Sequence, residues 1–463
     1  MTDTAAVPRP GSARAYRGHP WVDGQVRPLP LAATVATRTA TNTATNAAAP
    51  VGAVESAQLN RATGASRMSR MPRLSGQPAI VLLASLVVTL LASSSAPTPL
   101  YAIYQGRWGF SSITTTVVFG VYALAVLVSL LTLGKLSDHL GRRPILLAAL
   151  AAQAVSLVVF ATADGVPALL TARVIQGLST GAALGAIGAG MLDVDRERGT
   201  FANAVSPGMG TGSGALISAV LVRYLPAPTH LIYLVLLGVL ALQALGVVFM
   251  RETVTPKPGA LATLVPEIHL PRELRGSVLV AAPVLFAVWA LAGLYGALGP
   301  ALVHTLTGSS EVILGALSLT ALAGPAVVAV VALRHAAART VMRTGILALI
   351  TGVAITLLAL DIRSISLFFV GTVISGVGFG SGFQGGIRTV VPRAAPHERS
   401  GVLSLLYVVS YLGMGLPAVI AGFLVVHGGG LVTTAYEYGA AVIVLATPAL
   451  FELLRPTRPA AIQ

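Results

Sequence analysis

The chain contains no cysteine, which excludes a disulfide framework, thiolate chemistry and a zinc site built from cysteines. Charged residues are also scarce: Asp, Glu, Lys and Arg make up 10% of the 463 residues, against about 25% in soluble domains. Hydrophobic residues make up 55%. A chain with so little charge cannot keep an ordinary protein surface hydrated, so an ordinary soluble protein is excluded and lipid must cover much of the apolar area.

Motifs of enzymes and cofactor sites are also missing. No H-E-x-x-H zinc motif is present. The spacing Gly380-x-Gly382-x-x-Gly385 fits the dinucleotide fingerprint, but it lies inside an apolar run with no preceding strand. We therefore expect no enzyme activity, no catalytic residues, no metal site and no cofactor.

The first 77 residues are rich in Ala, Thr, Asn and Pro and carry nine arginines against Asp3, Asp23 and Glu55. Such a composition cannot bury enough apolar surface to order itself, so residues 1–77 are predicted to be a disordered cytoplasmic tail. A basic interaction tail and a passive extension both remain open. Met68 and Met71 offer later starting points, and we expect residues 1–67 to be dispensable.

From Pro78 onward, apolar runs of membrane-crossing length recur, each closed by Gly, Pro or charge. About 20 residues of helix cross the roughly 30 Å of hydrocarbon in a bilayer. The pattern predicts an all-α membrane protein with spans at 78–101, 112–133, 144–163, 168–191, 202–225, 230–250, 278–301, 312–333, 344–361, 366–388, 400–427 and 431–454.

The net charge of +14 is distributed unevenly between the two sides of these spans. Alternate connections hold most of the Lys and Arg, whereas the opposite connections hold only Arg107, Arg223 and Arg363. We expect the protein to lie in the inner membrane of the cell. The positive-inside rule then places both of its termini in the cytoplasm. Because the basic residues lie between apolar runs without interleaved aromatics, nucleic-acid binding is not expected.

A polar linker at 251–277 divides the spans into halves of six, at 78–250 and 278–454, with a short cytoplasmic tail at 455–463. The fourth span reads Arg173-Val-Ile-Gln-Gly177, and the tenth reads Thr372-Val-Ile-Ser-Gly376 at an offset of 199 residues. The repeat indicates two duplicated halves with pseudo-symmetry.

The connection after the second span carries a loop motif at residues 134–144, whose key members are Gly134, Asp138, Gly141, Arg142 and Arg143. It resembles the loop signature G-x-L-x-D-x-x-G-R-R/K of the major facilitator superfamily of secondary transporters, at the same place in the topology. The resemblance covers about residues 78 to 454. It implies two six-helix halves that move against each other, so that a site between them opens alternately to the two sides of the membrane. It also implies a conformational latch, made by Asp138 and Arg142 against the start of the eleventh span near Ser400. A solvated loop whose charges only orient the chain is the alternative.

Arg173, Gln176 and Gly177 in the fourth span resemble the family motif R-x-x-Q-G, whose arginine is linked to proton transfer. The resemblance implies a coupling role, with the proton as coupling ion. A charge inside a span is costly and needs a reason. An arginine that only reaches toward the outer interface is the alternative.

The fifth span favours export. Gly199, Gly208 and Gly212 keep the spacing of the family's antiporter signature, although Ser213 replaces its proline. A proton-coupled importer remains open, as does a transport-dead sensor or assembly protein that keeps the fold.

By resemblance, spans one, four, seven and ten line the central cavity, and candidate contacts to a small-molecule substrate there are Tyr101, Trp289, Tyr295, Phe383 and Gln384. Acidic residues fall only at or near the span ends, which argues against a strongly cationic substrate. An apolar cavity with a few polar groups suits a neutral or anionic organic molecule. We expect a monomer with the lipid bilayer as its surroundings.

Overall fold

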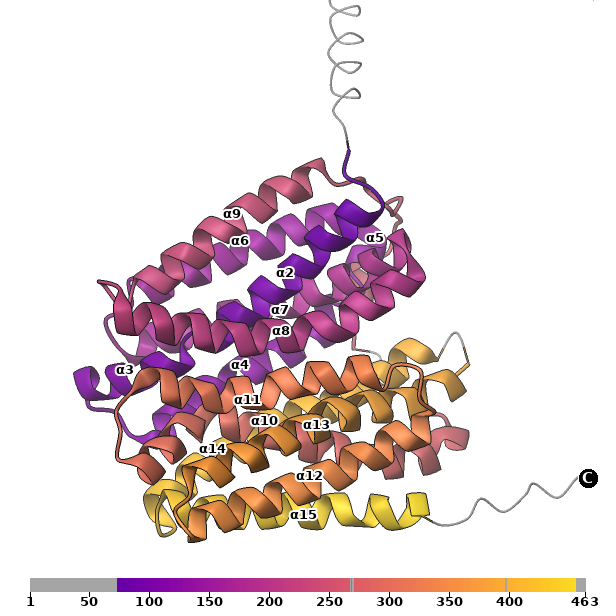
Figure 1. Ribbon diagram of the computed structural model, residues 1–463. Helices are drawn as coiled ribbons and strands as arrows, with labels where there is room; N and C mark the ends of the chain where they lie inside the picture. The colour runs from indigo at the N-terminus through magenta and orange to yellow at the C-terminus, as the bar shows by residue number, and fades with distance from the viewer. Residues whose placement is uncertain (1–72, 267, 269, 396–397, 455–463) are drawn as a thin grey trace, which may run out of the picture. The chain divides into compact units, whose positions relative to one another are not determined.

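The computed structural model describes residues 73–266, 268, 270–395 and 398–454; the expectations for residues 1–67 and for the tail from 455 onward lie outside this part. Within it the secondary structure is helical, apart from an isolated bridge between Leu74 and Met250. Twelve of the described helices are long and apolar enough to cross a membrane. The all-α fold with twelve spans is therefore confirmed (Figure 1).

The first half comprises α2 (Gln77–Ser95), η1 (Thr98–Leu100), α3 (Tyr101–Trp108), α4 (Ser112–Leu133), α5 (Ser137–Leu140), α6 (Arg142–Ala161), α7 (Val166–Val194), α8 (Arg196–Tyr224) and α9 (Leu231–Phe249). The connection to the second half holds two 3-10 turns, η2 (Ala260–Leu264) and η3 (Arg272–Leu274). The second half comprises α10 (Arg275–Thr307), α11 (Val312–Ala332), α12 (Ala338–Asp361), α13 (Ile365–Val390), η4 (Val391–Arg393), α14 (Arg399–His427) and α15 (Leu431–Leu454).

The first and seventh spans are longer than predicted. The first was expected to end at 101, but it runs through α2, η1 and α3 to Trp108. Helix α10 extends to Thr307 rather than 301, and it keeps Pro300 inside. Membrane helices tolerate proline because neighbouring groups can satisfy the carbonyls that it frees, so a proline did not mark the end of either span.

Each half has its own apolar core. One cluster of buried residues belongs to the first half and runs from Ala79 to Met250. A second is built on α10 to α15 and takes in Ala215 and Ala219 of α8. A smaller third cluster joins α4 to α14 and includes Tyr122. The two larger clusters therefore each lie mostly within one half, and α4, α8 and α14 link the halves.

Two helix pairs carry much of the contact between the halves: α4 packs along α14, and α8 packs along α11 (Figure 1). Small residues allow the close approach. A Cβ at Gly422 would lie 1.9 Å from Thr116 Oγ1, and one at Gly212 would lie 3.3 Å from Ala323 Cβ. Close packing of small residues is a main source of helix association in lipid.

Candidate functional site

The loop motif turns sharply between α5 and α6. Gly141 has φ +101°, a conformation that favours glycine, and a Cβ there would lie 2.9 Å from a carboxylate oxygen of Glu252. That carboxylate accepts hydrogen bonds from the backbone N–H groups of Arg142, at 2.8 Å, and of Arg143, at 2.9 Å. A residue from the segment after α9 therefore caps the start of α6, where an anion also meets the positive end of the helix dipole.

Arg142 is the buried centre of the motif, with 6% of its surface exposed. Its guanidinium donates to Asp138, to Ser137 Oγ at 2.7 Å and to Asp193 Oδ2 at 3.1 Å. Asp193 lies near the end of α7 and also accepts from Thr253 Oγ1 at 3.0 Å. The loop thus ties together α5, α6, the end of α7 and the start of the linker after α9.

The motif residues Asp138, Arg142 and Arg143 therefore make contacts inside their own half. Arg143 donates to the carbonyls of Val247, at 3.2 Å, and of Val248. In the described part of the chain, neither Asp138 nor Arg142 bonds to Ser400 at the start of α14, where the latch is expected. The side chain of Asp138 stays half exposed, at 51%.

Arg173 is fully buried in α7, and Gln176 and Tyr101 lie against it. It donates to Tyr101 Oη at 2.6 and 3.2 Å, to the Ser94 carbonyl at 2.8 Å and to Gln176 Oε1 at 2.6 Å. The rings of Tyr122, Phe160 and Tyr101 lie 5.2, 5.5 and 5.9 Å from its guanidinium carbon. Among the described residues no carboxylate forms an ion pair with Arg173. Hydrogen bonds and aromatic faces stabilise this charge in place of an acid.

Gly177 lets α7 approach α4. A Cβ there would lie 2.5 Å from Ala125 Cβ and 2.8 Å from the Tyr122 carbonyl oxygen. Real Cβ atoms do not come this close, so a side chain at this position would force the two helices apart. The sequence motif of Arg173, Gln176 and Gly177 therefore combines a buried charge, its hydrogen-bond partner and a packing contact.

The same helix contains the spacing Gly177-Leu178-Ser179-Thr180-Gly181, which matches the G-x-S-x-G pattern of hydrolases. That pattern needs a strand-to-helix turn that exposes the serine. Here Ser179 lies inside α7, is 3% exposed and donates to Gln153 Oε1 at 2.6 Å. This serine is part of the helix packing and is not a nucleophile.

Tyr295, on α10, lies inside the second half. Its hydroxyl is 2.8 Å from Thr372 Oγ1 and 3.5 Å from Thr356 Oγ1. A cavity of about 20 Å³ adjoins it, which is room for about one water molecule. Thr372 is the residue that the repeat aligns with Arg173, so both halves place a tyrosine hydroxyl against this position.

Trp289 and Phe383 belong to an aromatic cluster next to the boundary between the halves. The Trp289 ring lies 5.5 Å from that of Phe383, 6.0 Å from that of Phe379 and 5.0 Å from that of Tyr411. The same residue packs against the α4–α14 core that contains Tyr122.

Two buried polar atoms lack partners among the described residues, one on Trp289 of this aromatic cluster and one on Gln384, the residue that follows Phe383 in α13. Trp289 Nε1, a donor, and Gln384 Oε1, an acceptor, are both buried and have no hydrogen-bond partner in the described structure. An unpaired buried polar group costs about 1–3 kcal/mol. These two atoms are therefore suited to hold a polar ligand.

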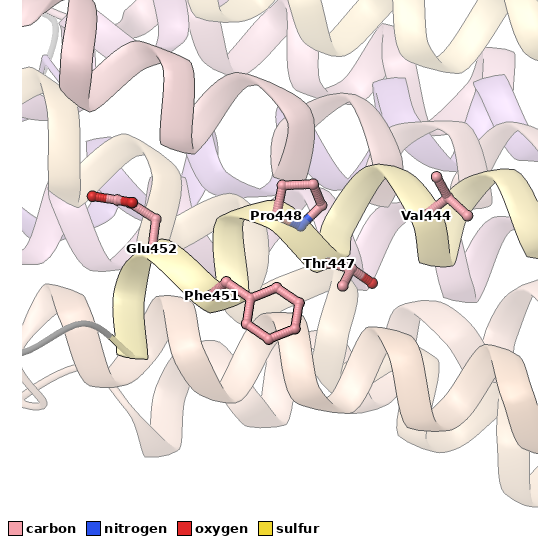
Figure 2. Close-up of a pocket in the computed structure, with 5 residues that line it drawn as sticks. All are labelled: Val444, Thr447, Pro448, Phe451 and Glu452. Atoms are coloured by element: carbon pink, nitrogen blue, oxygen red, sulfur yellow. The ribbon is translucent and has the colours of Figure 1, made fainter.

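A surface hollow on α15 is a weaker candidate. Its five lining residues, Val444, Thr447, Pro448, Phe451 and Glu452, all come from that one helix (Figure 2). Val444 is 70% exposed and Phe451 is 66% exposed. Exposed apolar side chains on a membrane helix suit contact with lipid.

Sequence reasoning missed three contributors to these sites: Glu252, Asp193 and Tyr411. Asp193 was assigned only to a span end, and Glu252 only to the linker. The stretch Arg251-Glu252-Thr253 directly after the sixth span was an available signal, because its glutamate lies on the same side of the membrane as the loop motif in the predicted topology.

The described residues thus form a polytopic helical fold, with a buried charge network in one half and an aromatic cluster next to the boundary between the halves. Solved structures of the nucleoside transporter NupG and of its mutant form align with TM-scores of 0.61 and 0.64, each at 14% identity. They cover 82% and 81% of this chain and 100% and 99% of theirs. The human organic anion transporter MFSD10 (TETRAN) aligns with a TM-score of 0.60 at 18% identity, over 80% of this chain and 98% of that one.

A relative from Rickettsia bellii, described as an uncharacterized transporter, is 38% identical over 74 residues, which is 16% of this chain and 18% of that protein. The sequence model of the Major Facilitator Superfamily matches residues 81–348, more than half of the chain. The chain belongs to this superfamily. Members of this superfamily are secondary transporters of small solutes and not enzymes.

Proposed function

We propose that this transporter exports a small neutral or anionic organic solute in exchange for protons, by alternating access across the inner membrane. The observation that carries the proposal is Arg173, a fully buried cation without an ion-paired acid among the described residues. A fixed positive charge inside the membrane repels cationic solutes and favours neutral or anionic ones. The same side chain is the proposed coupling element, together with Gln176 and Gly177.

The direction of transport rests on α8. Gly208 and Gly212, which keep the antiporter spacing, face α11 in the other half: a Cβ at Gly208 would lie 2.5 Å from Val327 Cγ2. A pattern typical of exchangers therefore lies where the halves must move against each other. The proposed arrangement has both termini in the cytoplasm and a single chain as the working unit.

Purified protein in proteoliposomes tests direction and coupling. Uptake of nicotinamide, benzoate and tetraphenylphosphonium is measured with the interior made acidic or alkaline. Exchange with protons gives uptake driven by an acidic interior, whereas an importer gives uptake driven by an acidic exterior. Uptake of the cation alone would contradict the proposed charge selectivity, and binding without movement would indicate a sensor.

The proposed solute site combines Trp289, Phe383 and Gln384. Aromatic walls suit a planar ring, and the unpaired indole N–H and amide oxygen suit polar groups on the same molecule. The hydroxyls of Tyr101 and Tyr295 already bond to Arg173 and to Thr372. Their proposed role is therefore indirect: each tyrosine supports the site through contacts within its own half.

Trp289→Phe keeps an aromatic ring and removes the indole N–H. We expect it to weaken binding of a transported solute about twofold to tenfold, the value of one hydrogen bond, as measured by isothermal titration calorimetry. Trp108→Phe is the control, because Trp108 stacks on Tyr104 at 4.7 Å, far along the chain from the cluster. Equal affinity in the Trp289 variant and wild type would remove this residue from the site.

Asp138→Asn tests the latch. In the proposed cycle, the charged side chain meets the start of α14 only when the cytoplasmic ends of the halves close. A contact with a helix end contributes about 0.3–1 kcal/mol when exposed and up to about 2 when partly buried. We expect the Asn variant to shift the population toward the cytoplasm-open state by no more than this contact energy, where about 1.4 kcal/mol corresponds to a tenfold shift.

Spin-label distances between the cytoplasmic ends of α4 and α14 measure this shift, and the absence of cysteine from the chain leaves no background labelling. Asp164→Asn, on the opposite side of the predicted topology, is the matched control. Unchanged distances in the Asp138 variant would make Asp138 an ordinary loop charge held by Arg142.

A further inference from the structure

The first span is interrupted by two prolines. Pro97 and Pro99 have no N–H, so the carbonyls of Ser93 and Ser95, four residues earlier, lose their helical donors. The chain passes this break as the 3-10 turn Thr98–Leu100 before helix resumes. In a membrane such freed carbonyls must find donors elsewhere in the protein.

Side chains of the first half donate to three carbonyls at this break, and that of Ser93 is one of the two that the prolines free. The bonds run from Gln176 Nε2 to the Ser93 carbonyl at 3.1 Å, from Arg173 to the Ser94 carbonyl at 2.8 Å, and from Ser218 Oγ to the Ala96 carbonyl at 2.7 Å. All of these bonds stay within one half. The break therefore moves with the first half as a unit.

Helix α10 of the second half has a related feature. Pro300 lies inside it and cannot donate to the carbonyl of Gly296, four residues earlier. The hydroxyl of Thr98 donates to that carbonyl at 3.3 Å. Thr98 is 3% exposed, so water does not compete for the bond. The turn that contains Thr98 also packs against α8, α10 and α11.

We propose that Thr98 is a positioning residue of the transport cycle, whose hydroxyl holds the two halves together through the Gly296 carbonyl that Pro300 leaves free. We call the end of the bundle beside this contact, where the chain turns at 109–111 and 308–311, the outer end. When the halves move apart there, the bonds at Ser93, Ser94 and Ala96 travel with the first half and the Thr98 bond breaks. The contact thus favours the state closed at the outer end.

The test is the distance between spin labels on cysteines introduced at Ser111 and Ser310, which lie in the two outer loops. Thr98→Val keeps the shape of the side chain and removes the hydroxyl. We expect the ratio of outer-open to outer-closed molecules to rise about twofold to tenfold, the effect of one hydrogen bond. Thr98→Ser should restore the wild-type ratio.

Thr434→Val is the matched control, because Thr434 is fully buried and its hydroxyl donates to the carbonyl of Gly430, just before its own helix, at 2.9 Å. It should leave the distances unchanged. A distance shift of the same size in this control would mean that loss of any buried hydroxyl loosens the bundle, and the proposal would be wrong.

Pro300→Ala provides a second, independent route to the same contact. It returns an N–H that competes with Thr98 for the Gly296 carbonyl, so it should shift the ratio in the same direction. If both substitutions act on this bond, the double variant shifts the ratio no further than the larger single effect. Additive shifts, or wild-type distances in Thr98→Val, would overturn the proposal. These distances need no solute, so they test it separately from the direction, coupling and selectivity proposed above.

Discussion

Arg173→Ala is expected to lower gradient-driven transport by at least about tenfold per folded molecule. The substitution removes bonds to Tyr101, Ser94 and Gln176, and hydrogen bonds to charged groups contribute about 1.5–3 kcal/mol each. Arg173→Lys keeps the charge but lacks the planar fork, so we expect partial activity. The measurement is the proteoliposome assay with an imposed pH gradient, normalised to protein that elutes as a single species in size-exclusion chromatography.

Arg223→Ala is the control for Arg173. Arg223 pairs with Glu311 at 3.2 Å, and both side chains are about half exposed. Exposed pairs contribute little, so its transport rate should stay within about twofold of wild type. Wild-type transport by Arg173→Ala would show that the buried charge serves folding alone.

Gly177→Ala and Gly376→Ala are expected to lower the free energy of unfolding by about 1–3 kcal/mol each, the usual cost of overpacking. The repeat places both glycines at corresponding positions. A Cβ at Gly376 would lie 2.3 Å from the Leu322 carbonyl oxygen, so backbone must move to admit it, as at Gly177. Denaturant titration followed by circular dichroism measures the loss.

Gly238→Ala is the matched control, since a Cβ at this position in α9 has no atom within 4 Å. Alanine forms helix better than glycine by up to about 1 kcal/mol, so this variant should be as stable as wild type or more stable. If Gly177→Ala matched the control, the close approach of α4 and α7 would not limit stability.

The spans were predictable because membrane thickness sets their length, and the loop motif and the fourth-span motif were predictable because each lies within a few residues of sequence. The spacing of Arg173 and Gln176 places them one turn apart on one face, and in the structure the two side chains form a hydrogen bond. Contacts between distant segments were not predictable. Nothing in the local pattern pairs Arg142 with Asp193, which lies 51 residues away.

The aromatic residues show the same limit. Tyr101 and Tyr295 were grouped with Trp289 as cavity-lining residues because all of them lie on spans that the family resemblance places around the central cavity. Rotation about the helix axis decides which way each side chain faces, and the sequence alone did not fix that rotation. The structure gives both tyrosine hydroxyls partners inside their own halves.

Arg173 in the first half and Thr372 in the second half occupy corresponding positions of the repeat, and the difference in their charge has an electrical consequence. Arg173 lies seven residues into α7, about 10 Å from its start at 1.5 Å per residue, whereas its repeat counterpart is neutral. A membrane potential exerts about 2.3 kcal/mol per 100 mV on a unit charge carried across the full field. A rocking motion that displaces Arg173 along the membrane normal therefore moves a positive charge through the field. The equivalent displacement of Thr372 in the second half moves no charge. Transport of even a neutral solute would then depend on voltage, through the half that holds the arginine.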